Sequence, residues 1–256
     1  MYKRQVKENP KIFTGFSDTT NNHFMLHKLG LSTFYGPCFL ADLGELDKEM
    51  LPYTRSYFEK YFSDNEMIEI KSSKVWYEDR KSYDVSQVGI PRPVHNEVHG
   101  FETIKGSGIV TGKLFGGCID SIYDMFVGER YGDENIIFEK YKLLPRLDEW
   151  KEKVLFLETS EETPAPLKLR EILLEFKIRG ILDNVKGIIV GKPIDEIYYE
   201  EYKKVYLEVM KDCNTPIMYN INFGHASPRC FLQYDAEATV DYDKKTIVIK
   251  SKKLTL

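Results

Sequence analysis

Several features are scarce in this chain of 256 residues, and each scarcity excludes a class of protein. There are four cysteines: Cys38, Cys118, Cys213 and Cys230. They show no Cys-x-x-Cys spacing, so neither a disulfide framework nor a zinc site is expected. No apolar run approaches membrane-spanning length, and none follows Met1 as it would in a signal peptide. The net charge is -4, whereas proteins that bind nucleic acids usually carry an excess of basic residues. We therefore expect a soluble cytoplasmic protein that binds neither membranes nor nucleic-acid polymers.

The chain is rich in apolar residues, which make up 42% of it and which can fill a sizeable core. Apolar residues at helical spacing predict helices, and short apolar runs predict strands. The helices are expected over 19–29, 51–62, 119–127, 167–178 and 200–211, the strands over 11–16, 154–157, 187–190 and 216–221, and a hairpin over 238–249. This alternation predicts an α/β fold with mostly parallel strands.

Ser17 lies where the first predicted strand meets the first predicted helix, in the segment Gly-Phe-Ser-Asp. Such a junction is typical of a nucleophile elbow, whose tight turn exposes the serine hydroxyl beside a helix N-terminus. Gly15 is small, as the turn requires, but Thr19 occupies a position where the α/β-hydrolase signature has glycine. On pattern alone, a helix-capping role for Ser17 or Asp18 is favoured over catalysis.

A carboxylate and a histidine follow two other predicted strands. Glu158 ends the run 154–157, and His225 follows Phe-Gly after the strand 216–221. Sites of parallel sheets gather at the carboxyl ends of strands. A carboxylate there can orient an imidazole, which can take the proton of a serine. The order Ser, Glu, His thus predicts a triad, although Glu161 and Glu162 compete with Glu158, and each residue alone also fits an ordinary surface or turn role.

Three other patterns are weaker evidence for a functional site. The histidines and the glutamate in 95–99 are spaced His-x-Glu-x-His, which is not the helical His-Glu-x-x-His of zinc enzymes, so no metal site is expected. The glycine-rich stretch 106–117 fails the spacing of a phosphate-binding loop, and Leu114 replaces its Ser or Thr. Trp76 lies in the irregular stretch 71–100, where an aromatic ring either stacks on a substrate or simply packs.

Taken together, these segments resemble the LD-carboxypeptidases and the related microcin C immunity proteins. The segments that carry the resemblance are 15–20 (GFSDTT), 34–37 (FYGP), 112–117 (GKLFGG), 155–158 (LFLE), 187–191 (GIIVG) and 223–225 (FGH). The resemblance runs from about residue 9 to the end and implies a cofactor-free serine peptidase. It implies Ser17 as nucleophile, His225 as general base and Glu158 as its orienting partner, with the Asp18 N–H in the oxyanion hole. Members cleave amide bonds beside a free carboxylate, in murein tetrapeptides or an aminoacyl-nucleotide antibiotic, and commonly form homodimers.

The resemblance also implies two domains. Residues 1–70 are expected to form a nucleophile domain with a truncated parallel sheet, and residues 101–256 a mixed α/β domain that supplies Glu and His. Residues 71–100 are expected to be an irregular linker or binding loop. The segment 69–76 is similar to the immunity-protein branch, in which a loop tryptophan stacks on a nucleobase, and this implies substrate binding by Trp76.

The sequence departs from the family at two points. Family members carry strands and helices before the elbow, with a Gly-Gly turn that supplies one oxyanion-hole amide, whereas this chain begins just before the elbow strand. Losing one such donor costs about 10²–10³ in turnover. Cys118 stands where many relatives have Asn and is expected to pack. The alternatives are therefore an impaired or inactive chain that acts only as a binding protein, and an ordinary α/β-hydrolase esterase, which Thr19 disfavours.

Overall fold

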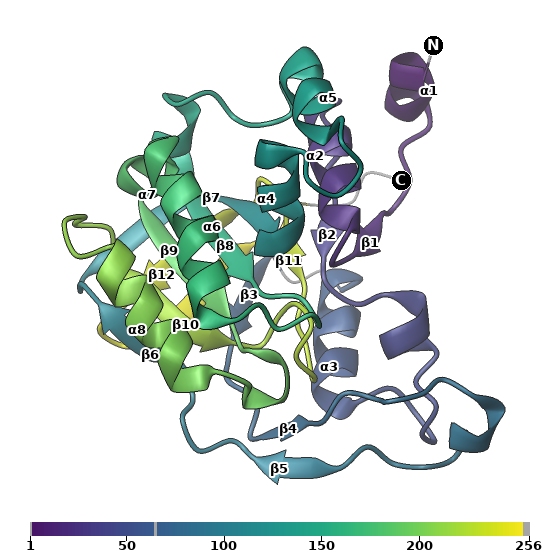
Figure 1. Ribbon diagram of the computed structural model, residues 1–256. Coiled ribbons are helices and arrows are strands. Elements are labelled where there is room, and N and C mark those ends of the chain that lie inside the picture. The colour runs from purple at the N-terminus through teal and green to yellow at the C-terminus, as the bar shows by residue number, and fades with distance from the viewer. Residues whose placement is uncertain (1, 64–65, 253–256) are drawn as a thin grey trace.

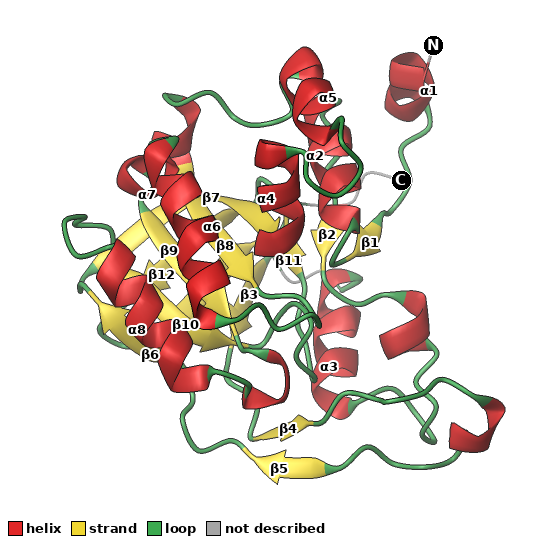
Figure 2. Ribbon diagram, viewed as in Figure 1, coloured by secondary structure: helices red, strands yellow, loops and turns green. Residues whose placement is uncertain are grey.

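A computed structural model describes residues 2–63 and 66–252 and contains one large mixed sheet (Figures 1 and 2). Its eight strands are, in sheet order, β3 (Met67–Ile70), β13 (Thr246–Lys250), β12 (Glu237–Asp241), β7 (Ile109–Cys118), β8 (Lys153–Glu158), β9 (Gly187–Gly191), β10 (Ile217–Ile221) and β6 (Glu102–Lys105). The four central strands, β7 to β10, pair in parallel. The other four pairings are antiparallel. The α/β class is confirmed, with the predicted parallel pairing confined to the centre of the sheet.

Helices cover one face of this sheet. Further helices belong to the N-terminal segment, which lies beside the sheet. The α-helices are α1 (Tyr2–Glu8), α2 (Thr19–Lys28), α3 (Pro52–Tyr61), α4 (Ile119–Val127), α5 (Glu134–Tyr141), α6 (Pro166–Ile178), α7 (Ile181–Asn184) and α8 (Tyr199–Val209). Short π or 3-10 turns are η1 (Phe39–Leu43), η2 (Val85–Gln87), η3 (Glu149–Glu152) and η4 (Ile194–Glu196). Helices α4, α6 and α8 lie over the sheet in Figure 1. The five predicted helices are confirmed within two residues at each end. Of the described helices, none is long and apolar enough to span a membrane.

The central strands form because they are apolar on both faces. Every residue of β8, β9 and β10 is buried, as expected for parallel strands covered on both sides. The sequence did not predict β7, the longest strand, because its glycines interrupt any apolar pattern. Partners on both sides, β8 and β12, hold this glycine-rich segment in the sheet.

Two smaller sheets stand beside the large one. One joins β1 (Thr14–Gly15), β2 (Phe34–Tyr35) and β11 (Leu232–Gln233), so a segment from near the C-terminus completes an N-terminal sheet. The other is the antiparallel ribbon of β4 (Val75–Tyr77) and β5 (Val94–Asn96), which lies at the lower edge of Figure 1. Strand β3, in turn, joins the large sheet. The proposed boundaries at 70 and 100 remain a prediction.

Candidate functional site

Ser17 sits in the turn between β1 and α2, with its backbone in the left-handed region at φ 63°. This conformation is unfavourable for a residue with a side chain and is concentrated at functional sites. Gly15 makes the turn possible, because a Cβ there would lie 2.8 Å from the Thr19 hydroxyl. That hydroxyl donates to the Phe16 carbonyl, at 2.8 Å, so threonine is accommodated where glycine was expected. The geometry is that of the predicted elbow.

Asp18 does not cap α2 through its side chain. Its carboxylate instead accepts a hydrogen bond from Arg130 at 2.9 Å. Within the described part of the chain, no intramolecular hydrogen bond takes up the backbone N–H of Asp18. A free N–H directly after a half-buried serine that lines a pocket is a donor available to a developing oxyanion.

Glu158 and His225 form a buried pair at the carboxyl ends of β8 and β10. Oε2 of Glu158 lies 2.7 Å from Nδ1 of His225 and also accepts from the His225 backbone N–H at 3.1 Å. Their side chains are 0% and 6% exposed. Gly224 permits this approach, because it has φ 85° and a Cβ there would lie 2.4 Å from Cγ of Glu158. The carboxylate thus holds both the ring and the backbone of the histidine.

Tyr35 connects this pair to the serine turn. Its hydroxyl donates to the second oxygen of Glu158, and the Ser17 backbone N–H donates to the same hydroxyl at 3.2 Å. Burial, together with the charge of Glu158, raises the pKa of Tyr35 well above its ordinary value, so the phenol stays protonated. The segment 34–37 contributes to the family resemblance, but no sequence pattern indicated a role for Tyr35.

The other ring nitrogen of His225 faces a second carboxylate. Oε2 of Glu161 lies 2.8 Å from Nε2, close enough for an ion pair but outside hydrogen-bond alignment. Burial alone would lower the pKa of His225, but Glu158 and Glu161 outweigh it and raise that pKa to about 9. The contact with His225 lowers the pKa of Glu161 to about 2. In this arrangement the imidazole is held in its charged form.

Ser17 and Glu161 line one pocket of about 320 Å³, and Glu161 connects this pocket to the buried Nε2 of His225, which does not itself line it. The Phe16 ring also contacts the His225 ring edge-on, with centroids 4.8 Å apart. Among the described residues, no hydrogen bond joins the Ser17 hydroxyl to His225. Larger hollows of 390 and 500 Å³ lie elsewhere and contain none of these residues.

Cys118 is buried beside this group, with one atom each of Cys118, Glu158 and His225 lying within 4.8 Å of one another. Burial and the charge of Glu158 raise the pKa of the thiol well above its ordinary value, which disfavours the thiolate that binds metals. The Glu158 carboxylate is already engaged by His225 and Tyr35. This donor set therefore fits a hydrogen-bonded group better than a metal centre.

Trp76, the predicted substrate contact, is half-buried on β4 and stacks on His95 with ring centroids 4.2 Å apart. The next residue, Tyr77, donates its N–H to the Ser227 carbonyl at 2.9 Å, which ties β4 to the loop that carries His225. The ammonium of Lys192 lies 5.3 Å from the indole centroid. Trp76 is thus connected to the site through the β4 backbone.

A buried histidine on α2, His23, contacts the backbone of the serine turn. Nε2 of His23 lies 3.0 Å from the Gly15 carbonyl, and Nδ1 lies 2.7 Å from the Thr33 hydroxyl. Burial lowers the pKa of His23 to about 4, so the ring is neutral. Its ring stacks on that of Tyr234, with centroids 4.8 Å apart, so the residue packs in the interior.

Comparison with known proteins identifies the class. The family model described as the LD-carboxypeptidase C-terminal domain matches residues 111–240, and that of the N-terminal domain matches residues 2–36. The chain therefore belongs to the LD-carboxypeptidase family.

Three relatives illustrate what this chain is similar to. A solved MccF-like protein of Streptococcus pneumoniae, in complex with AMP, is 44% identical with a TM-score of 0.90, over 97% of this chain and 74% of that one. The Microcin C7 self-immunity protein MccF of Escherichia coli is 24% identical over 96% of this chain and 67% of its own length. A Bacillus subtilis protein named "Probable murein peptide carboxypeptidase" is 25% identical over 96% and 65%. The chain thus spans about two thirds of the length of these curated relatives.

A structure of MccF with aspartyl sulfamoyl adenosine has the same fold, with 23% identity and a TM-score of 0.79 over 99% of this chain and 71% of that one.

Proposed function

We propose that this protein is a serine hydrolase that cleaves an amide bond with the group Ser17, His225 and Glu158. The observation that carries the proposal is the Glu158–His225 pair beside a serine held at positive φ. Tyr35 bridges the two parts, and a free N–H follows the serine. Family membership supports serine peptidase chemistry, and the geometry supports these residues as its agents.

The proposed reaction begins when Nε2 of His225 takes the Ser17 proton and Oγ attacks the scissile carbonyl. The Asp18 N–H stabilises the oxyanion, and Glu158 stabilises the imidazolium. His225 then gives the proton to the leaving amine, and the acyl group remains on Ser17. A water molecule attacks this ester, its proton passes through His225, and the acid is released with the serine restored.

For the substrate we propose a small peptide or an aminoacyl nucleotide. The relatives provide the two choices, since one is named for murein peptides and others are solved with AMP or aspartyl sulfamoyl adenosine. The half-buried Trp76 favours the nucleotide, because a purine can stack on an indole that a peptide would not need. We retain the homodimer, the cytoplasmic location and the lack of any cofactor as predictions.

The test is hydrolysis of a murein tetrapeptide and of an aspartyl-adenylate analogue by the parent and by Ser17→Ala. Ser121→Ala is the matched control, because Ser121 lines the same pocket from α4. We expect cleavage of one substrate by the parent and by Ser121→Ala but not by Ser17→Ala. Equal rates in all three would reject the serine mechanism.

One observation favours the alternative of a binding protein. Glu161 occupies the vicinity of Nε2, the atom that must accept the serine proton. If this contact persists with ligand bound, the parent and Ser17→Ala would bind the aspartyl-adenylate analogue equally and neither would turn it over. Calorimetric binding beside the hydrolysis assay separates the two functions.

A further inference from the structure

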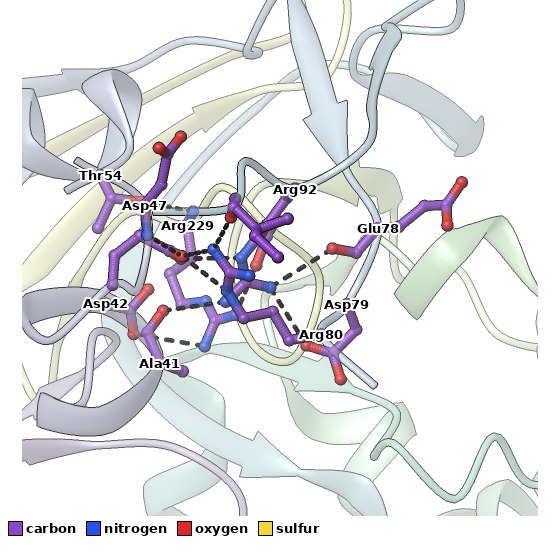
Figure 3. Close-up of polar contacts among 12 residues, drawn as sticks. Ala41, Asp42, Asp47, Thr54, Glu78, Asp79, Arg80, Arg92 and Arg229 are labelled. Atoms are coloured by element: carbon purple, nitrogen blue, oxygen red, sulfur yellow. Dashed lines mark hydrogen bonds and ion pairs between the residues drawn. The ribbon is translucent and has the colours of Figure 1, made fainter. Parts of the chain in front are cut away.

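Arg229 lies directly behind the proposed catalytic group and has no role in the reaction described above. Its side chain is fully buried and belongs to a set of charged residues that also includes Arg80, Arg92 and Asp42 (Figure 3). A guanidinium removed from water requires partners, since burial of an unpaired charge costs several kcal/mol. The partners of Arg229 show what it holds in place.

The first set of partners belongs to the loop that carries the histidine. Nη2 of Arg229 donates to the His225 carbonyl at 3.1 Å and to the Ser227 hydroxyl at 2.9 Å. The backbone of His225 is thus fixed from two directions, by Arg229 at its carbonyl and by Glu158 at its N–H.

The second partner belongs to the serine turn. Cζ of Arg229 lies 4.3 Å from the centroid of the Phe16 ring, within cation–π range. Phe16 directly precedes Ser17, and its ring also packs edge-on against His225. One guanidinium therefore contacts both segments whose side chains would exchange a proton, through hydrogen bonds to the histidine loop and through the Phe16 ring.

The guanidinium itself is anchored to a third segment. Nη1 lies 3.4 Å from Oδ2 of Asp42 in η1, and that oxygen also accepts from the Cys38 N–H at 2.9 Å. The Arg229 backbone N–H donates to Thr54 of α3 at 3.0 Å. Nε has no hydrogen-bond partner among the described residues. An unpaired buried donor destabilises the folded protein. The unpaired Nε belongs to an arginine whose other contacts reach both the serine turn and the histidine loop.

We propose that Arg229 is a positioning residue that sets the distance between the Ser17 turn and the His225 imidazole. The inference rests on the proposed function. Arginine suits the role because its planar group can donate from two edges while its face packs on a ring. Lysine keeps the charge but offers neither the fork nor the flat face.

The test compares Arg229→Lys with Arg80→Lys. Arg80 is a matched control because it is also buried and ion-paired, with Glu45, but contacts neither Phe16 nor His225. The rate at which an alkyl fluorophosphonate labels Ser17 is measured at a temperature where both variants are folded, along with kcat and KM. For Arg229→Lys we expect labelling and kcat to fall about 10- to 100-fold, as misplacement by a fraction of an ångström would cause, with KM nearly unchanged. Arg80→Lys should lose thermal stability but keep the parent's rates.

A second readout does not depend on catalysis. The side-chain NMR signals of His225 report its contacts with Phe16 and Glu158, and they should shift in Arg229→Lys but not in Arg80→Lys. If Ser17 in the parent does not react, the proposed function fails, while the NMR comparison still decides the role of Arg229. Parent-like His225 signals in folded Arg229→Lys would overturn the inference. So would an equal change in both variants.

Discussion

Glu161 places a carboxylate oxygen 2.8 Å from Nε2 of His225, the nitrogen that must be free and uncharged to accept the serine proton. Glu158 occupies the opposite nitrogen, and the two acids together raise the pKa of His225 to about 9 despite its burial. The Glu161 side chain is 59% exposed and so can swing away when a substrate enters. In the resting arrangement His225 is therefore mostly protonated at neutral pH, and only a small fraction of it is the neutral imidazole that can accept the serine proton.

Removal of the Glu161 charge should therefore increase activity near pH 7. In Glu161→Gln we expect the pKa on the acid limb of the kcat/KM profile to fall by about one unit. This shift would raise kcat/KM at pH 7 by up to about tenfold. Glu162→Gln serves as control, because Glu162 lines the same pocket without an ion pair to His225. An unshifted limb in Glu161→Gln would show that the contact does not form in solution.

The same raised pKa has a consequence for stability. Because folding favours the protonated form of His225, its contribution is fully present below the unfolded value of about 6.5 and is lost as pH rises through about 9. The difference in unfolding free energy between the parent and His225→Gln should therefore shrink from pH 6.5 to 9.5. Urea denaturation at several pH values measures it, and a difference that grows with pH would contradict the charged state.

Loss of the Tyr35 hydroxyl should impair catalysis beyond its effect on stability. Tyr35→Phe removes the donor to Glu158 and the acceptor of the Ser17 N–H, both of which orient proposed catalytic groups. Hydrogen bonds to charged groups contribute about 1.5–3 kcal/mol, which corresponds to about 10- to 100-fold in kcat if the loss falls on the transition state. Tyr234→Phe is the control, since its hydroxyl is equally buried but donates to the Gly116 carbonyl. Equal kcat in the two variants would remove Tyr35 from the mechanism.

Gly224 should tolerate no side chain. Both Gly224 and Gly30 have φ near 85°, but a Cβ meets Glu158 at Gly224 and open space at Gly30. Gly30→Ala should therefore cost only the backbone strain, about 1–2 kcal/mol. Gly224→Ala should cost more and should also separate Glu158 from His225, with loss of activity. Thermal melts and hydrolysis assays of both variants check this, and similar effects would mean that the close packing is not required.

The sequence indicated the positions of Ser17, Glu158 and His225 because each lies at or just after the end of a short strand, and such strands can be recognised from the local sequence. It could not indicate that Glu161 and not Ser17 lies against Nε2, since that depends on side-chain rotation within a loop. Arg229 carried no signal, because Asp42, the carboxylate with which it pairs, lies 187 positions away. Helices were predicted well from their period, whereas β7 was missed because pairing with β8 and β12, and not its own composition, makes it a strand.

The central claim, that Ser17 is a nucleophile activated by His225, is tested most directly by mass spectrometry after reaction with an alkyl fluorophosphonate. The account predicts one adduct, mapped to Ser17, in the parent, and none in Ser17→Ala or His225→Ala. An adduct on another residue, or equal labelling of Ser17 when His225 is replaced, would contradict it.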